Sequence, residues 1–164
     1  WWAPFLILTA WVFDWTDGRL SRLKNCRSRL GGYLDSTVGD LCEDLCYLGI
    51  ILYLYFYDSL FSPYAFVFGT FYFFGKYEAY ISLVYQTRFF HKEAVEAGQR
   101  PKPFSADKGW AKAFVIFEDA DIRLHFLALG LLFHAPAVPL VFYTFHFHLR
   151  WMLRVALVLL RNLR

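Results

Sequence analysis

No Asp, Glu, Lys or Arg interrupts residues 124–149, which read LHFLALGLLFHAPAVPLVFYTFHFHL. A second stretch without these charges covers residues 59–75. A helix rises about 1.5 Å per residue, so about 20 apolar residues cross a bilayer core that is about 30 Å thick. Stretches of this kind predict an all-α integral membrane protein, because a helix satisfies its own backbone hydrogen bonds within the membrane.

The overall composition agrees with this prediction. Of the 164 residues, 58% are hydrophobic and 22% are aromatic, whereas only 19% are charged, and the mean hydropathy is +0.35. A soluble domain has about a quarter charged residues. These values exclude a disordered chain, a collagen-like fibre and a small disulfide scaffold. The net charge of +3 is too small to indicate a nucleic-acid partner.

Five apolar segments are expected to form helices, separated by prolines and by short polar stretches. They cover residues 1–20, 33–57, 64–85, 122–134 and 137–160. We therefore expect residues 1–164 to form a single transmembrane domain with a bundle of five helices. The full chain is expected to have six helices, in which case the first helix is missing here.

The basic residues predict the orientation of this bundle. Lys and Arg gather in residues 19–29, 88–112 and 154–164, whereas the turns expected at residues 58–63 and 135–138 carry none. Five antiparallel helices place the three basic segments on one face. Cytoplasmic loops of membrane proteins carry an excess of Lys and Arg, so this face is predicted to be cytoplasmic.

Four aspartates lie next to the first basic segment: Asp14 and Asp17 precede it, and Asp35 and Asp40 follow it. Carboxylates in apolar helices are unfavourable unless they are paired or bind a cation. Asp14 and Asp17 share a helix face because they are three residues apart. A tight return of the chain would bring Asp35 to the same depth, and such oxygen ligands suit Mg²⁺ or Mn²⁺. Neutralisation of the neighbouring arginines is the alternative interpretation.

The same region resembles the signature of the CDP-alcohol phosphotransferases, D-x2-D-G-x2-A-R-x8-G-x3-D-x3-D. Residues 14–22 read DWTDGRLSR and residues 31–35 read GGYLD, and their spacing agrees with the signature without a gap. The resemblance implies six transmembrane helices with the motif on the second and third. It also implies metal-dependent transfer of a phospho-alcohol group from a CDP-alcohol to an acceptor hydroxyl, with release of CMP, in phospholipid biosynthesis at the cytoplasmic face.

The resemblance also assigns roles to individual residues. The implied metal ligands are Asp14, Asp17, Asp35 and, for a second metal, Asp40. The implied nucleotide-binding residues are Gly18, Ser21, Arg22 and Gly31. Gly18 would allow close approach of the nucleotide and Arg22 would bind a phosphate. For Gly31 and its neighbour Gly32, close packing of helices is the alternative.

The chain departs from the signature at two positions. Ser21 replaces an alanine, which is a small change, and Gly39 replaces the last aspartate, which serves in the family as the general base. Asp40 is adjacent but is rotated about 140° from Asp35 on a regular helix. A π-bulge would turn Asp40 inward. Glu43 lies on the stripe of Asp35 and is the other candidate base, and loss of activity is the remaining alternative.

Three charged residues inside the apolar segments are further candidates. Lys76 and Glu78 would face the bundle interior, where they either pair or line a polar acceptor cavity. Arg123 would hold an acceptor phosphate or extend its charge to the membrane surface.

Two other functions remain open on the sequence alone: a catalytically silent subunit of a membrane complex that binds metal or nucleotide, and an ion transporter or channel. The expected partners are a CDP-alcohol donor, a hydroxyl acceptor and membrane lipids, and a homodimer is compatible with the sequence.

Overall fold

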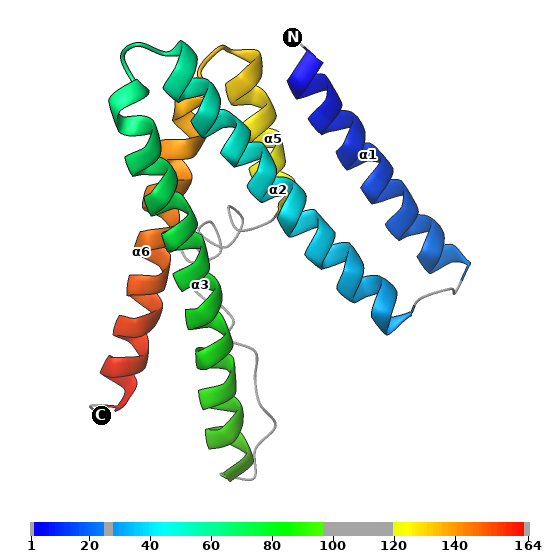
Figure 1. The fold of residues 1–164 in the computed structure, drawn as a ribbon. Coiled ribbons are helices and arrows are strands. Elements are labelled where there is room, and N and C mark those ends of the chain that lie inside the picture. Colours follow the sequence, from blue (N-terminus) through cyan, green and yellow to red (C-terminus); the bar gives the residue numbers. More distant parts are fainter. Residues whose placement is uncertain (1, 25–27, 97–119, 163–164) are drawn as a thin grey trace.

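The computed structural model describes residues 2–24, 28–96 and 120–162. Five helices occupy these ranges: α1 (Trp2–Leu23), α2 (Arg29–Tyr57), α3 (Ser62–Glu96), α5 (Ala120–Leu132) and α6 (Ala137–Asn162) (Figure 1). The all-α class and the five helices are therefore confirmed. Measured by length and hydropathy together, none of the helices in the described ranges qualifies as a membrane-spanning segment.

The bounds of four helices lie within four residues of the expected ones, but α3 is longer than expected. It continues from the expected end at residue 85 to Glu96. The physical reason is that this stretch holds neither proline nor glycine, and the first residue that favours a helix end is Gly98. The start of the basic segment 88–112 is thus helical, and its remainder lies outside the described residues.

The ends of α2 are fixed by polar side chains. Ser28 caps its start with an extended backbone, and its Oγ accepts a hydrogen bond of 2.9 Å from the Gly31 N–H. At the other end, Asp58 Oδ1 accepts hydrogen bonds of 3.0 Å from the N–H groups of Leu60 and Phe61. This capping turns the chain directly into α3.

The helices run up and down, so that the described parts of the three basic segments share one end. Figure 1 shows the end of α1, the start of α2 and the ends of α3 and α6 at one end of the molecule, and the α2–α3 and α5–α6 turns at the other. This arrangement agrees with the one expected from the charges. Which side of a membrane the basic end faces stays a prediction.

Side chains of α6 hold it along α3 by bonding to backbone carbonyl oxygens. Thr144 Oγ1 donates to Phe68 O at 3.3 Å and Arg154 Nη1 donates to Ala79 O at 2.6 Å. His148 Nε2 lies 3.0 Å from Phe71 O between them.

The core lies among α2, α3, α5 and α6 and is rich in tyrosine. Tyr47, Tyr72 and Tyr143 are fully buried, and the rings of Tyr47 and Tyr72 stack with their centroids 4.2 Å apart. In the described ranges, α1 adds only the partly buried Ile7 to this core and packs mainly against α5, whereas α2 packs mainly against α3. The first helix is therefore attached to the bundle through α5.

Candidate metal centre

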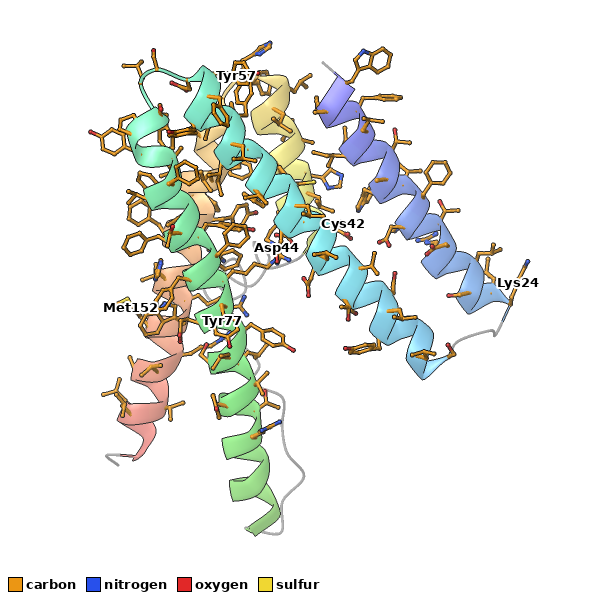
Figure 2. The ribbon with its side chains drawn as sticks, viewed as in Figure 1. Lys24, Cys42, Asp44, Tyr57, Tyr77 and Met152 are labelled. Carbon is orange, nitrogen blue, oxygen red and sulfur yellow. The ribbon has the colours of Figure 1, made fainter. Side chains whose placement is uncertain are left out.

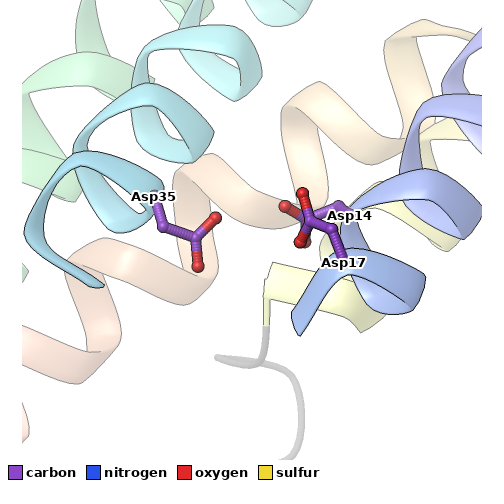
Figure 3. Close-up of side chains that lie close together, drawn as sticks. All are labelled: Asp14, Asp17 and Asp35. Carbon is purple, nitrogen blue, oxygen red and sulfur yellow. The ribbon is translucent and has the colours of Figure 1, made fainter. Parts of the chain in front are cut away.

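Three of the four predicted metal ligands meet at one point. Asp14 and Asp17 project from α1, and Asp35 points toward them from α2 (Figure 3). One carboxylate oxygen of each lies within 4.8 Å of the others, and all three residues are exposed. Hard oxygen donors on two helices, open to solvent, fit a divalent ion that keeps positions for water or phosphate oxygens. We call these residues the carboxylate group.

Two predicted nucleotide-binding residues lie just beyond this group on α1. The half-buried Ser21 donates a hydrogen bond of 3.0 Å from Oγ to the Gly18 carbonyl oxygen. The hydroxyl proton is thus engaged within the helix, and the Ser21 oxygen remains as an acceptor. Arg22 also lies on α1, but its side chain is outside the described part.

The two glycines at the start of α2 do not have the same surroundings. A Cβ added at Gly31 would lie 2.8 Å from Ser28 Oγ, which is the capping atom of this helix. A Cβ added at Gly32 would meet no atom within 4 Å. Close packing of helices is therefore not the role of Gly32 among the described residues, whereas Gly31 leaves room for the cap.

Glu43, the second candidate base, lies in a buried ion pair with Arg123. The guanidinium donates from Nε to Oε1 and from Nη2 to Oε2, each at 2.7 Å. Tyr72 donates its hydroxyl to Oε1 at 3.3 Å, and Lys76 Nζ lies 3.7 Å from Oε2. Glu43 is only 3% exposed, and both of its oxygens accept hydrogen bonds. This fork-shaped pairing joins residues 80 positions apart, which the sequence analysis did not predict.

Comparison with known proteins decides the family. A sequence model described as CDP-alcohol phosphatidyltransferase matches residues 1–160. The chain belongs to this family. Its members are metal-dependent, integral membrane enzymes that transfer a group from a CDP-alcohol to an acceptor, so the resemblance seen in the sequence is confirmed. No curated protein and no solved structure gave a significant match.

The position of the family's missing aspartate can be described directly. The helix α2 is α-helical at every residue from Arg29 to Tyr57, so the π-bulge considered above is absent. Gly39 lies on this regular helix, and an added Cβ would meet no atom within 4 Å. The glycine is therefore not required by the packing of the described residues.

Asp40 does not join the carboxylate group in this family member. It lines a pocket of about 470 Å³ together with residues of α3, α5 and α6. The charged side chains that line this pocket with it are Asp44, Lys76, Arg123, Arg150 and Arg154. We call it the Asp40 pocket. Asp40 thus lies outside the group of three carboxylates, and its predicted role, at a second metal or as the base, stays a prediction.

The two charged residues predicted inside the third helix have different surroundings. Lys76 lines the Asp40 pocket and donates to Asp44 Oδ1 at 2.6 Å, where α2 meets α3 (Figure 2). Glu78 instead lines a separate pocket of about 590 Å³ between α3 and α6. The sequence analysis did not predict Arg150 and Arg154 in the Asp40 pocket, although their four-residue spacing on one helix face was a signal for it.

Proposed function

We propose that this chain transfers a phosphatidyl or similar phospho-alcohol group from a CDP-alcohol to an acceptor hydroxyl and releases CMP, in phospholipid biosynthesis at the cytoplasmic face of a membrane. The observation that carries the proposal is the meeting of Asp14, Asp17 and Asp35 within 4.8 Å from two helices. These are the family's motif positions, and three carboxylates in this arrangement suit the divalent ion on which the transfer depends.

The carboxylate group would hold Mg²⁺ or Mn²⁺, and Ser21, Arg22 and the Gly18 backbone lie next to it on α1 to receive the nucleotide. Bound there, the ion supplies positive charge that stabilises the diphosphate and the CMP that leaves. Gly18 exposes backbone without a side chain, which lets a ribose or phosphate approach. An arginine at position 22 suits a phosphate because its fork of donors matches two oxygens.

The Asp40 pocket is the place that we assign to the acceptor. In this assignment, the hydroxyl oxygen of the acceptor forms a new bond to the phosphorus of the CDP-alcohol, and the bond from phosphorus to CMP breaks. The proton of the same hydroxyl passes to the Asp40 carboxylate. Glu43 is less suited to this role because Arg123 occupies both of its oxygens. The basic lining from Lys76, Arg150 and Arg154 favours a polar acceptor.

A catalytically silent member that binds metal and nucleotide is the second candidate. Gly39 at the position of the family's base favours it, since position 39 supplies no carboxylate one turn after Asp35. The two candidates differ in one measurable property, which is metal-dependent release of CMP.

The test uses the purified protein in liposomes, with CDP-diacylglycerol as donor and inositol, glycerol 3-phosphate or serine as acceptor, or with CDP-choline as donor and diacylglycerol as acceptor. We expect CMP to appear only when both Mn²⁺ and one of the acceptors are present, and Asp14→Asn to abolish it. Asp58→Asn is the matched control, because asparagine keeps the oxygen that caps the α2–α3 turn at the far end of the molecule. Binding of Mn²⁺ and CDP-alcohol without CMP release from any pair would support the silent member instead.

A further inference from the structure

The carboxylate group is divided between two helices that belong to different packing units. Asp14 and Asp17 lie on α1, which packs mainly against α5, and Asp35 lies on α2, which packs mainly against α3. Within the described ranges, no comparable packing joins α1 directly to α2. Apart from the short chain connection between Leu23 and Arg29, the two halves of the group are therefore held relative to each other through α5.

On one side, α5 is fixed to α1 close to the carboxylates. Trp11, one turn before Asp14, donates from Nε1 to Asp121 Oδ1 at 2.9 Å. The ring of His125 meets the Trp11 ring edge to face with centroids 4.5 Å apart, and its Nδ1 lies 2.6 Å from the Asp121 carbonyl oxygen. Trp11 thus contacts the start of α5 through a directed hydrogen bond and a ring contact, and not only through apolar packing.

On the other side, α5 is fixed to α2 by the buried ion pair. Arg123, two residues after Asp121, binds both oxygens of Glu43, and the two side chains are 10% and 3% exposed. Glu43 follows Asp35 by about two turns on the same helix. Two parallel hydrogen bonds restrict distance and orientation together, which a single bond does not.

We infer that Arg123 is a positioning residue that, through Glu43 on one side and the Asp121–Trp11 contact on the other, sets the separation between Asp14 and Asp17 on α1 and Asp35 on α2. The inference rests on the metal role of the carboxylate group proposed above. Arg123 does not need to touch the ion. It acts by holding α5 against α2, so that the three carboxylates stay close enough to share one cation.

The first test measures Mn²⁺ binding to the purified protein by electron paramagnetic resonance, without substrate. Outer residues that orient metal ligands typically change metal affinity by about 10- to 100-fold, and we expect a loss in this range for Arg123→Lys, which keeps the charge and removes the fork. Trp11→Phe removes only the hydrogen bond to Asp121 and is expected to weaken binding less. Thr144→Val is the matched control, because the Thr144 hydroxyl bonds to carbonyl oxygens of α6 and α3, and neither helix carries a residue of the group.

The second test measures the separation itself. Nitroxide labels at Thr16→Cys on α1 and Leu34→Cys on α2, both exposed, report the distance between the helices by pulsed dipolar spectroscopy in a variant whose native cysteines are serine. Arg123→Lys should broaden or shift this distance, and Thr144→Val should leave it unchanged. The distance measurement needs no metal and so is independent of the proposed function.

The outcomes separate the two proposals. If wild-type protein binds Mn²⁺ and Arg123→Lys binds it equally well with an unchanged distance, the positioning role is wrong and the metal centre stands. If wild-type protein does not bind Mn²⁺, the metal centre is overturned, and the distance measurement alone decides whether Arg123 sets the separation of the two helices. In an active protein assayed at saturating acceptor, Arg123→Lys should raise the Mn²⁺ concentration needed for half-maximal rate.

Discussion

Gly39→Asp restores the last aspartate of the family signature, and the structure allows the consequence to be worked out. A Cβ at position 39 meets no atom within 4 Å, so the substitution causes no clash with the described residues. Glycine and aspartate cost about 1 and about 0.7 kcal/mol relative to alanine in a helix interior, so the fold should be nearly unaffected. Position 39 is four residues after Asp35, which places a new carboxylate one turn further along nearly the same face of α2.

The effect on the rate depends on which carboxylate accepts the acceptor's proton. General-base catalysis contributes about 10²- to 10⁴-fold. We expect Asp40→Asn to lower the rate of CMP release by that order, and Gly39→Asp in the same protein to recover a large part of it. In otherwise wild-type protein, Gly39→Asp should change the rate far less, because Asp40 already supplies a base. A fourth carboxylate near Asp35 should also tighten Mn²⁺ binding.

The assay is Mn²⁺-dependent CMP release in liposomes, with thermal unfolding measured on every variant. Gly39→Asn is the matched control, since it has the size of aspartate without the ionised group. Full activity of Asp40→Asn would refute the assignment of the base to Asp40. If Gly39→Asn restored CMP release in the Asp40→Asn protein as well as Gly39→Asp does, the ionised carboxylate at position 39 would not be the cause of the recovery. Activity that appears only after Gly39→Asp, from an inactive wild type, would establish that the natural chain is the silent member.

Two further predictions concern packing and orientation. A Cβ at Gly130 would lie 2.7 Å from Cγ of the rigid Pro139 ring, whereas a Cβ at Gly49 meets nothing within 4 Å. Overpacking typically costs about 1–3 kcal/mol, so Gly130→Ala should give a lower free energy of unfolding than Gly49→Ala by that amount, and equal values in denaturant titrations would contradict the close contact. For the orientation, an impermeant thiol reagent added to intact cells should label Leu60→Cys in the α2–α3 turn but not Lys24→Cys after α1; labelling of the latter would reverse the predicted topology.

The carboxylate group was predictable because its geometry is mostly local. A spacing of three residues places Asp14 and Asp17 on one face of any α-helix, and a short return between two helices brings Asp35 to their level. The same local reasoning located the helices themselves, since apolar segments and prolines are read along the chain. It failed for the end of α3, where amphipathic residues without proline or glycine continue a helix that the charge pattern suggested had ended.

The Glu43–Arg123 pair was not predictable for the opposite reason. The two residues are 80 positions apart, and their contact depends on how α5 packs against α2. From the sequence, Glu43 was a candidate base by its position on the stripe of Asp35, and Arg123 was a candidate phosphate ligand. Each assignment followed from one helix considered alone. Burial of one charge requires a partner, but the sequence does not say which of the available partners the packing selects.

The carboxylate that stands at position 40 instead of position 39 of α2 points in a different direction from the helix. Successive residues of a helix are about 100° apart, so moving a carboxylate from position 39 to position 40 turns it away from the line through Asp35. In this structure the carboxylate group lies on the α1 side of α2, while Asp40 lines the pocket formed with α3, α5 and α6. An aspartate at position 39 would place the base on the same face of α2 as the metal-binding carboxylates. With the aspartate at position 40, the two tasks are divided between the two faces of α2, and the acceptor hydroxyl must reach the phosphorus from the pocket side. The attacking hydroxyl must also lie within hydrogen-bond reach of its base, so transfer with Asp40 as the base requires the CDP-alcohol to bind with its phosphorus displaced from the carboxylate group toward Asp40.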